Sequence, residues 1–310
     1  MTQENILVIQ PLPGLGDLAW FHEHMTAIAD RASDKKITLL TKPAIAPQIF
    51  QGSPYIKEVL VAKKTSLFSL VRLLKSRSFT EVWILHHSWR YTIACKLAGI
   101  KVVYGYGRHL GHFFLQNPRL TRHEFHSHPI KRADHLIQKH GLKPTGNLFQ
   151  ANKNEMETIE ERLGGFPKPW IALGIGGSES FKKWPLESFA SLARYLEDYG
   201  TVFVFAGKQE EEEAKLIAQL GVVNLTSRII PLTHLSIQES LGFLSLCDLF
   251  VGNDTGMLNF AAILGKPSVG LFLKTPSLNY KENMYPLVTD SKGKIDPKTV
   301  IGLLKSKKLI

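Results

Sequence analysis

Three short polar segments of the sequence hold residue types that could bind phosphate or move a proton. The first contains Gly14, Gly16 and Asp17, between an apolar run and a helical pattern. Glycines let a backbone turn tightly and approach a ligand closely. The Asp17 carboxylate could act as a general base or could do no more than cap the helix. A third glycine is missing, which disfavours a dinucleotide cofactor.

The second segment follows the strand-like run 170–174 and is rich in glycine. Backbone N–H groups around Gly177 and Ser178 could bind phosphate oxygens, and Lys182 could neutralise them. The segment is no Walker loop, because neither of its lysines is followed by Ser or Thr.

The third segment is the polar run from Gly252 to Gly256, with a helical pattern after it. The N–H groups of Thr255, Gly256 and Met257 would point out of the helix start, which is a ready anion site. Asp254 could cap this helix or bind a hydroxyl of a ribose or sugar. A capped helix alone would explain less of the segment, because a cap requires fewer polar residues.

Apolar runs and helical patterns alternate along the chain, which indicates parallel βαβ units. Strands are expected at 6–9, 37–40, 59–61, 82–85, 102–104, 170–174, 201–206, 222–225, 249–251 and 268–272. Helices are expected at 18–31, 67–76, 91–98, 131–140, 154–163, 186–199, 210–220, 237–246, 257–264 and 297–305.

Two interruptions divide this pattern. Residues 108–131 are rich in His and Arg without a clear period, and they predict either a long functional loop or a poorly ordered stretch. Residues 141–169 are rich in Gly and Pro and predict the inter-domain linker. The sequence therefore predicts an α/β protein with two Rossmann-like doubly wound domains, 1–150 and 151–310.

Composition limits the partners and the location. The 310 residues carry a net charge of +11, and the basic residues are concentrated in the first 150. Such a surface attracts nucleic acid, anionic membrane or acidic substrates. Nucleic acid is disfavoured, because no recognised motif is present and the aromatic residues do not interleave with the basic runs. Without a long apolar segment or a signal peptide, we expect a cytoplasmic protein.

A metal site is not expected. The chain has 12 histidines, and His123, His126 and His128 are closely spaced. No carboxylate or cysteine is placed to complete a site with them. An Asp-x-Asp pair, which would hold a divalent ion on a diphosphate, is also missing. Charge on a diphosphate would have to be met by lysine and a helix dipole.

Taken together, the three segments resemble the bacterial heptosyltransferase family, which adds heptose from ADP-heptose to the lipopolysaccharide core. Their order and spacing match over nearly the whole chain. The matching motifs are Pro13-Gly14-Leu15-Gly16-Asp17, Lys182-Lys183-Trp184-Pro185, and Gly252-Asn253-Asp254-Thr255-Gly256 followed by Ala261-Ala262-Ile263-Leu264-Gly265-Lys266-Pro267. The resemblance implies the GT-B architecture, with two domains facing a central cleft, and inverting sugar transfer without an essential metal.

The resemblance also implies roles for single residues. Asp17 corresponds to the proposed general base and Lys182 to a phosphate-binding lysine. Gln209 lies near an expected nucleoside contact. Gly177 and Ser178 fall near the phosphates, and the donor loop corresponds to Asp254, Thr255, Gly256 and Met257.

One position departs from the family, because Asn259 stands where a histidine is usual. Asparagine can donate a hydrogen bond but cannot carry charge. The resemblance further implies a first domain for the acceptor and a second domain for the donor. We expect the last helix, 297–305, to pack back on the first domain.

The partners implied are a nucleotide-sugar, ADP-linked, and an anionic glycolipid or glycan acceptor. No cofactor is implied. The basic first half would suit peripheral association with the inner face of the inner membrane. Two alternatives stay open: a non-catalytic glycolipid binder, favoured by Asn259, and a sugar-nucleotide epimerase on the same fold. The first is opposed by the intact Asp17 and Lys182, and the second lacks identifiable acid/base residues.

Overall fold

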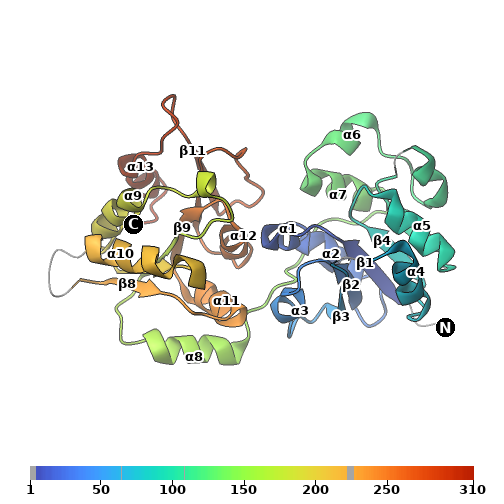
Figure 1. Cartoon of the computed structure of the whole chain (residues 1–310), viewed down its shortest axis with the longest axis horizontal. Coiled ribbons are helices and arrows are strands. Elements are labelled where there is room, and N and C mark those ends of the chain that lie inside the picture. The colour runs from blue at the N-terminus through green and yellow to red at the C-terminus, as the bar shows by residue number, and fades with distance from the viewer. Residues whose placement is uncertain (1–4, 64, 108, 222–226) are drawn as a thin grey trace. The chain divides into compact units, whose positions relative to one another are not determined.

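The chain forms two compact units, Met1–Gln150 and Ala151–Ile310, each with its own sheet (Figure 1). The computed structural model describes residues 5–63, 65–107, 109–221 and 227–310. The predicted strand 222–225 lies outside the described residues.

The first unit is a five-stranded parallel sheet with helices on both faces. Its order is β3-β2-β1-β4-β5, the order of a Rossmann-like half. The elements are β1 (Ile6–Gln10), α1 (Leu15–Trp20), α2 (His22–Ala29), β2 (Ile37–Thr41), α3 (Ala46–Ile49), β3 (Ile56–Val61), α4 (Leu67–Lys75), β4 (Glu81–Ile84), α5 (Trp89–Leu97), β5 (Val102–Gly105), the 3-10 helix η1 (His109–Phe114), α6 (Arg122–His126) and α7 (Pro129–Gln138).

Every residue of β1 and β2 is buried, as expected for central parallel strands covered on both sides. One face packs against α4 and α5, where Leu70, Leu74 and Cys95 belong to the same hydrophobic core as Leu7 and Ile9 of β1. On the other face, α2 lies against α7. The carboxyl ends of all five strands therefore share one edge, at which loops can present functional side chains.

The second unit repeats the plan with one more strand. Its order is β11-β10-β9-β6-β7-β8, and all pairs are parallel. The elements are α8 (Lys153–Leu163), β6 (Trp170–Gly174), η2 (Ser180–Lys182), α9 (Leu186–Leu196), β7 (Thr201–Phe205), η3 (Lys208–Glu210), α10 (Glu211–Gly221), β8 (Ile229–Leu232), α11 (Ile237–Leu246), β9 (Leu249–Asn253), α12 (Gly256–Ile263), β10 (Ser268–Phe272), β11 (Met284–Val288) and α13 (Pro297–Ser306).

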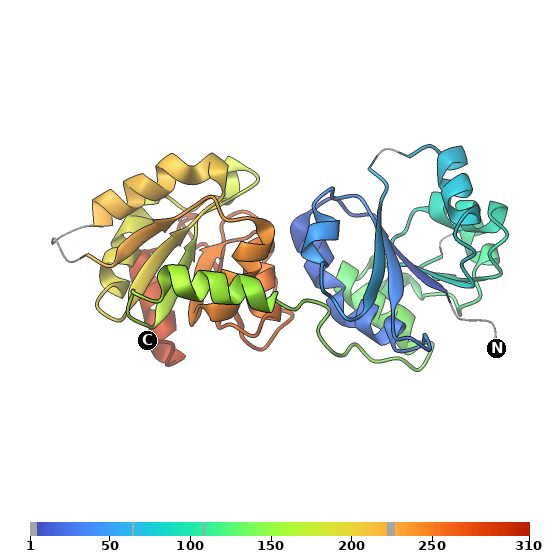
Figure 2. The same ribbon diagram turned by 90° about the horizontal axis from the view of Figure 1, so that it is seen from below.

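Two groups of helices cover this sheet. The helices α9, α10 and α13 share a core with alternate residues of the strands. On the opposite side α8 runs alongside α11, as Figure 2 shows, and Gly242 of α11 lies against the backbone of Glu155. Phe243 of α11 contacts the rings of Phe203 and Phe205 on β7.

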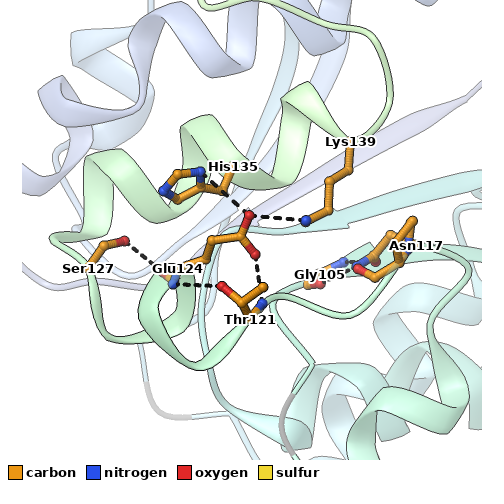
Figure 3. Close-up of polar contacts among 8 residues, drawn as sticks. Gly105, Asn117, Thr121, Glu124, Ser127, His135 and Lys139 are labelled. Carbon is orange, nitrogen blue, oxygen red and sulfur yellow. Dashed lines mark hydrogen bonds and ion pairs between the residues drawn. The ribbon is translucent and has the colours of Figure 1, made fainter.

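The stretch rich in His and Arg is ordered and attached to the edge of the first sheet. Asn117 uses both ends of its amide on Gly105, accepting from its N–H at 2.9 Å and donating to its C=O at 3.0 Å (Figure 3). Thr121 and Glu124 form a capping box at the start of α6. The Glu124 carboxylate also accepts a 3.1 Å hydrogen bond from Lys139, which fastens α6 to the end of α7. The alternative of a poorly ordered stretch is therefore wrong for the residues described here.

Several sequence expectations need correction. The helix expected at 18–31 is two helices, which meet at Phe21. Residues 141–169 are not all linker, because Leu148 and Phe149 are buried in the first unit and α8 packs in the second. Helix α13 contributes Val300 and Leu304 to the core of the second unit, and its expected packing on the first domain stays a prediction.

Candidate functional site

In the second unit, the predicted site residues gather where the loops after β6 and β9 leave the sheet. These neighbouring strands lie at the centre of the sheet, where the strand order reverses. In doubly wound sheets this point is the ligand crevice. Asn253, the last residue of β9, joins the two loops: its Nδ2 donates to the carbonyls of Ile175 at 2.8 Å and Gly176 at 3.2 Å. Its Oδ1 accepts from the Trp184 backbone N–H at 2.9 Å.

Trp184 anchors the lysine-containing loop from its other side. The indole N–H donates to the Ile295 carbonyl at 2.9 Å, and the ring packs edge-on against Phe189. The side chain is only 2% exposed. A buried tryptophan with a satisfied N–H is a rigid support, so the residues just before it, Lys182 among them, are held in place.

The two adjacent lysines have different surroundings. Lys183 Nζ lies 3.3 Å from Glu210 and 3.2 Å from Glu213. Although burial opposes it, hydrogen bonds to these carboxylates raise the pKa of Lys183. Lys182 Nζ has a looser neighbour, the Glu179 carboxylate at 3.8 Å. Lys183 is therefore held by two carboxylates of its own unit, whereas Lys182 has a single carboxylate neighbour at a longer distance among the contacts described.

Helix α12 begins at the same edge. Thr255 is its N-cap residue, and the Thr255 side chain makes no capping hydrogen bond within the described part of the chain. Gly256 and Met257 form the first turn. Asp254 is turned to the next loop, where its Oδ2 accepts a 2.8 Å hydrogen bond from Thr275 Oγ1. The carboxylate is thus positioned by the loop after β10 and does not cap the helix with its side chain.

Asn259 is buried beneath this helix start, at 3% exposure. Its Nδ2 donates to the Thr255 carbonyl at 2.9 Å, and its Oδ1 accepts from the Tyr280 hydroxyl at 2.9 Å. The asparagine that departs from the family pattern therefore connects the first turn of α12 to the loop after β10. A neutral amide satisfies both contacts.

Gly252 has a packing role rather than a ligand role. It is a residue of β9, not of a loop, and a Cβ there would lie 2.6 Å from the Gly174 carbonyl oxygen. A Cβ on Gly174 would in turn lie 2.4 Å from the ring of Phe250. Glycine at positions 174 and 252 therefore lets β6 and β9 pair closely with the Phe250 ring packed against them.

The remaining predicted residues of this unit also lie at the carboxyl edge. Gly177 and Ser178 are in the loop after β6, where a Cβ on Gly177 would crowd Lys183 at 2.8 Å. Gln209 is exposed on η3, after β7. Its neighbour Glu210 is buried at 8% exposure.

In the first unit, Gly14, Gly16 and Asp17 follow β1. Gly14 is the N-cap of α1, and Asp17 is three residues into the helix rather than at the cap. The Asp17 Oδ2 accepts a 2.9 Å hydrogen bond from the Gly14 N–H. The buried Gln10 side chain donates to the Asp17 carbonyl at 3.1 Å. Asp17 therefore caps its helix, and its half-buried carboxylate is held in one orientation.

A second feature of the same edge was not predicted from the sequence. A pocket at the ends of β4 and β5 is lined by Ile84, His86, His87, Ser88, Trp89, Thr92 and Gly105–Gly107. The rings of His86 and His87 stack at 4.4 Å. Burial and, after it, the electrostatic effects of His87, Lys42 and Arg132 together lower the pKa of His86 to about 4. Two cations, Lys42 and Arg132, therefore act electrostatically on a side chain that lines this pocket.

Nothing in the described residues groups three His, Cys, Asp or Glu side chains as a metal site would require. His123 and His126 are exposed on α6. His128 accepts at Nδ1 from the Ile130 N–H, 3.4 Å away, at the start of α7. Across the described ranges, no helix is long and apolar enough to span a bilayer.

Comparison with known proteins identifies the family. The sequence model of glycosyltransferase family 9 (heptosyltransferase) matches residues 67–292, which is more than half of the chain. The chain belongs to glycosyltransferase family 9. The match includes the second-unit residues from Gly177 to Asn259 and begins after Asp17, which gains no support from it.

Relatives agree with this assignment. Lipopolysaccharide heptosyltransferase 1 of Campylobacter coli is 30% identical over 154 residues, which are 47% of this chain and 44% of that enzyme. The aligned region thus spans less than half of this relative. The E. coli ADP-heptose LPS heptosyltransferase II structure has a TM-score of 0.77 at 18% identity, covering 97% of this chain and 98% of that one. E. coli heptosyltransferase WaaC with ADP-2-deoxy-2-fluoro heptose has a TM-score of 0.75 at 15% identity, covering 98% and 99%. This likeness shows the GT-B fold.

Proposed function

We propose that the chain is an inverting glycosyltransferase that transfers heptose from ADP-heptose to a lipopolysaccharide core or related glycan, without a metal. The observation that carries the proposal is the ordered edge of the second unit, where Asn253 fixes the lysine loop beside the start of α12. Family membership and the ADP-heptose-dependent relative favour this donor over other nucleotide-sugars.

The second unit would bind the donor through its diphosphate. The N–H groups at Thr255, Gly256 and Met257 face the direction from which an anion is attracted to a helix start. Lys182, next to the anchored Trp184, would supply the positive charge. Gly177 and Ser178 would approach the phosphates, and Gln209 would contact the nucleoside from η3.

The first unit would bind the acceptor and supply the general base. The acceptor hydroxyl oxygen attacks the anomeric carbon and gives its proton to the Asp17 carboxylate. The bond between that carbon and the phosphate oxygen breaks, and ADP leaves with the electron pair. Lys182 and the start of α12 stabilise the charge that develops on ADP. Attack opposite to the leaving group inverts the configuration.

The acceptor we propose is an anionic glycolipid, met at the inner face of the inner membrane. The pocket beside His86 favours this class, because two cations, Lys42 and Arg132, act electrostatically on His86. An acceptor with carboxylate or phosphate groups would be attracted to it.

A glycolipid binder without activity is the second candidate, because Asn259 replaces the usual histidine. The geometry weakens this candidate. Asn259 is fully engaged inside the unit and holds the helix start through Thr255 and Tyr280. The replacement therefore preserves the support of the donor loop, and Asp17 and Lys182 remain in place.

The first experiment is a thermal-shift screen with ADP-, GDP-, UDP- and CDP-linked sugars. ADP-heptose should raise the Tm selectively, and Lys182→Ala should weaken ADP binding by about tenfold, the effect of removing a charged hydrogen bond. Lys298→Ala, an exposed lysine on α13, is the matched control. Selective stabilisation by another base, or unchanged ADP affinity in Lys182→Ala by calorimetry, would contradict the donor assignment.

A transfer assay separates the remaining alternatives. Heptose release only when acceptor is present supports the transferase. Turnover of the donor without acceptor would identify the epimerase, and donor binding without either reaction would identify the binder.

A further inference from the structure

The net positive charge of the chain comes entirely from its first unit. Residues 1–150 contain 20 Lys and Arg against 9 Asp and Glu, whereas residues 151–310 contain 18 of each. The excess is steepest between residues 61 and 120, which hold ten Lys and Arg and one acidic residue, Glu81. Glu81 is already paired with Arg31, whose Nε lies 3.0 Å from its Oε1.

Exposed apolar side chains gather in the same segment. Among the described residues, seven of the twelve large apolar side chains that are exposed lie between residues 61 and 114. The most exposed are Phe113 at 81%, Phe68 at 78% and Trp89 at 63%. The others are Val61, Leu67, Leu97 and Phe114. Soluble surfaces rarely gather so many aromatic rings without a partner.

The fold places the three aromatic side chains at one edge. Phe68 is in the first turn of α4, Trp89 begins α5, and Phe113 is in η1. Each element follows a strand of the parallel sheet and so starts at its carboxyl edge. Helix α5 packs against both α4 and η1, and Figure 1 shows α4 and α5 together on one side of the first unit. Asp17 follows β1 at this same edge.

Basic side chains accompany these rings. Lys63 precedes α4 and is exposed, and Arg72 and Lys75 are exposed on α4 itself. Aromatic rings with nearby lysine and arginine suit the headgroup region of an anionic bilayer, where rings enter the interface and cations meet phosphates. A soluble acidic partner would explain the cations but would leave these rings without a reason to be exposed.

We propose that the first unit docks on an anionic lipid surface through the rim formed by α4, α5 and η1. Phe68, Trp89 and Phe113 enter the headgroup layer, and Lys63, Arg72 and Lys75 contact lipid phosphates. The inference deepens the proposed function by naming the surface that meets the membrane. Docking through this rim brings a glycolipid headgroup to the edge that carries Asp17.

The test is co-sedimentation of the full chain with vesicles of phosphatidylcholine, with or without about one third phosphatidylglycerol. Binding should require the anionic lipid and weaken with salt. The pairs Phe68→Ser with Phe113→Ser, and Arg72→Glu with Lys75→Glu, should each weaken binding about tenfold or more. The matched pairs in the second unit, Leu216→Ser with Leu220→Ser and Lys298→Glu with Lys308→Glu, should leave it unchanged.

Trp89 provides a direct signal of insertion. Trp83, Trp170 and Trp184 are buried and Trp20 is partly buried, so Trp89 is the most exposed indole described. Its emission should shift to the blue on binding and be quenched by brominated lipids, and Trp89→Phe should abolish the quenching. Equal binding to neutral vesicles, no effect of the rim variants, or no quenching would overturn the proposal. So would self-association through the rim without vesicle binding.

Failure of this proposal can be told from failure of the proposed function. The Phe68/Phe113 variant should retain the thermal shift with ADP-heptose and transfer to a delipidated acceptor. If the native chain binds vesicles but shows neither donor binding nor transfer, the function fails and the docking surface stands. If it transfers to the delipidated acceptor but ignores anionic vesicles, the docking surface fails alone.

Discussion

The carboxyl edges of the two sheets are built from the same topology but are stabilised in opposite ways. In the second unit, one buried amide, Asn253, fixes two loops, and Lys183 is neutralised by Glu210 and Glu213. In the first unit, the Asp17 carboxylate accepts a hydrogen bond from the Gly14 N–H at its own helix start, and the cations Lys42 and Arg132 act electrostatically on His86. The edge of the second unit is held in place by hydrogen bonds within the protein. The edge of the first unit has the cations Lys42 and Arg132 acting on His86.

This difference would suit the two substrates that we propose. The diphosphate leaving group of the proposed donor would be the same in every cycle, so an edge of fixed geometry could bind it each time. The proposed anionic acceptor would have to be attracted and oriented from solution or from a lipid surface, and an electrostatic field of cations would favour this. The same doubly wound sheet can therefore carry a preorganised binding site or a site that attracts its ligand by charge, and a few loop residues decide which.

Among the variants considered, Asp17→Asn should have the largest effect, and it tests whether the edge of the first unit supplies the general base. Asn can still accept from the Gly14 N–H, so the start of α1 should survive, but it cannot take a proton. We expect kcat to fall by about 10² or more, with ADP affinity and Tm nearly unchanged. The measurement is steady-state transfer with a glycan acceptor, with calorimetry of ADP binding as control. A loss of kcat below about threefold would contradict the role of Asp17 as the general base.

Replacing Asn253 by Ala would test the edge of the second unit. The Trp184 N–H and the Ile175 carbonyl would lose their partner inside the protein, and each unsatisfied group costs about 1–3 kcal/mol. We expect urea unfolding to show a loss of about 3 kcal/mol and ADP binding to weaken with it. Asn279→Ala, an exposed site in the same unit, should change stability by less than about 0.5 kcal/mol. If both variants unfold alike, the amide does not hold the edge.

The smallest effect concerns acidity at the edge of the first unit. Folding lowers the pKa of His86 from 6.5 to about 4, chiefly through burial and then through His87, Lys42 and Arg132. The unfolded chain therefore takes up a proton before the folded chain does. Stability from the neutral ring is present above pH 6.5 and is lost as the pH falls towards 4.

His86→Gln removes this titration. Discounted for partial exposure, the native chain should lose about 1–2 kcal/mol more than the variant between neutral pH and about pH 4. Thermal unfolding across this range measures the difference. His123→Gln, at an exposed position of α6, should keep the native pH dependence. Identical curves for His86→Gln and the native chain would show that folding does not lower the pKa of His86.

The sequence predicted the fold well because periodicity reports on buried strands and amphipathic helices. Strands β6 and β10 and helix α11 have the predicted bounds. The edge strand β11 was missed, because Met284–Val288 is only partly buried and contains Pro286. Short helices such as α6 were missed because their stability comes from a capping box and from Lys139, which is distant in sequence.

The candidate site was predicted less evenly. Motif spacing pointed to Lys182 and to the start of α12, because backbone geometry there follows from a strand, a turn and a helix. The supporting contacts of Asn253, Thr275 and Tyr280 join residues that are far apart in the chain, so no local sequence pattern predicts them. The pocket at His86 was missed for the same reason, since β4 and β5 must pair before it exists.

The division of charge between the two units makes the whole chain an electric dipole. Twenty basic against nine acidic residues in one unit, and equal numbers in the other, produce a torque in any external field. Near an anionic surface the chain would rotate before contact, with its first unit leading. The effect would appear in association rates and would fade within a Debye length of about 8 Å at physiological salt. Approach with the first unit leading would therefore be favoured over approach with the neutral unit, most strongly at low salt.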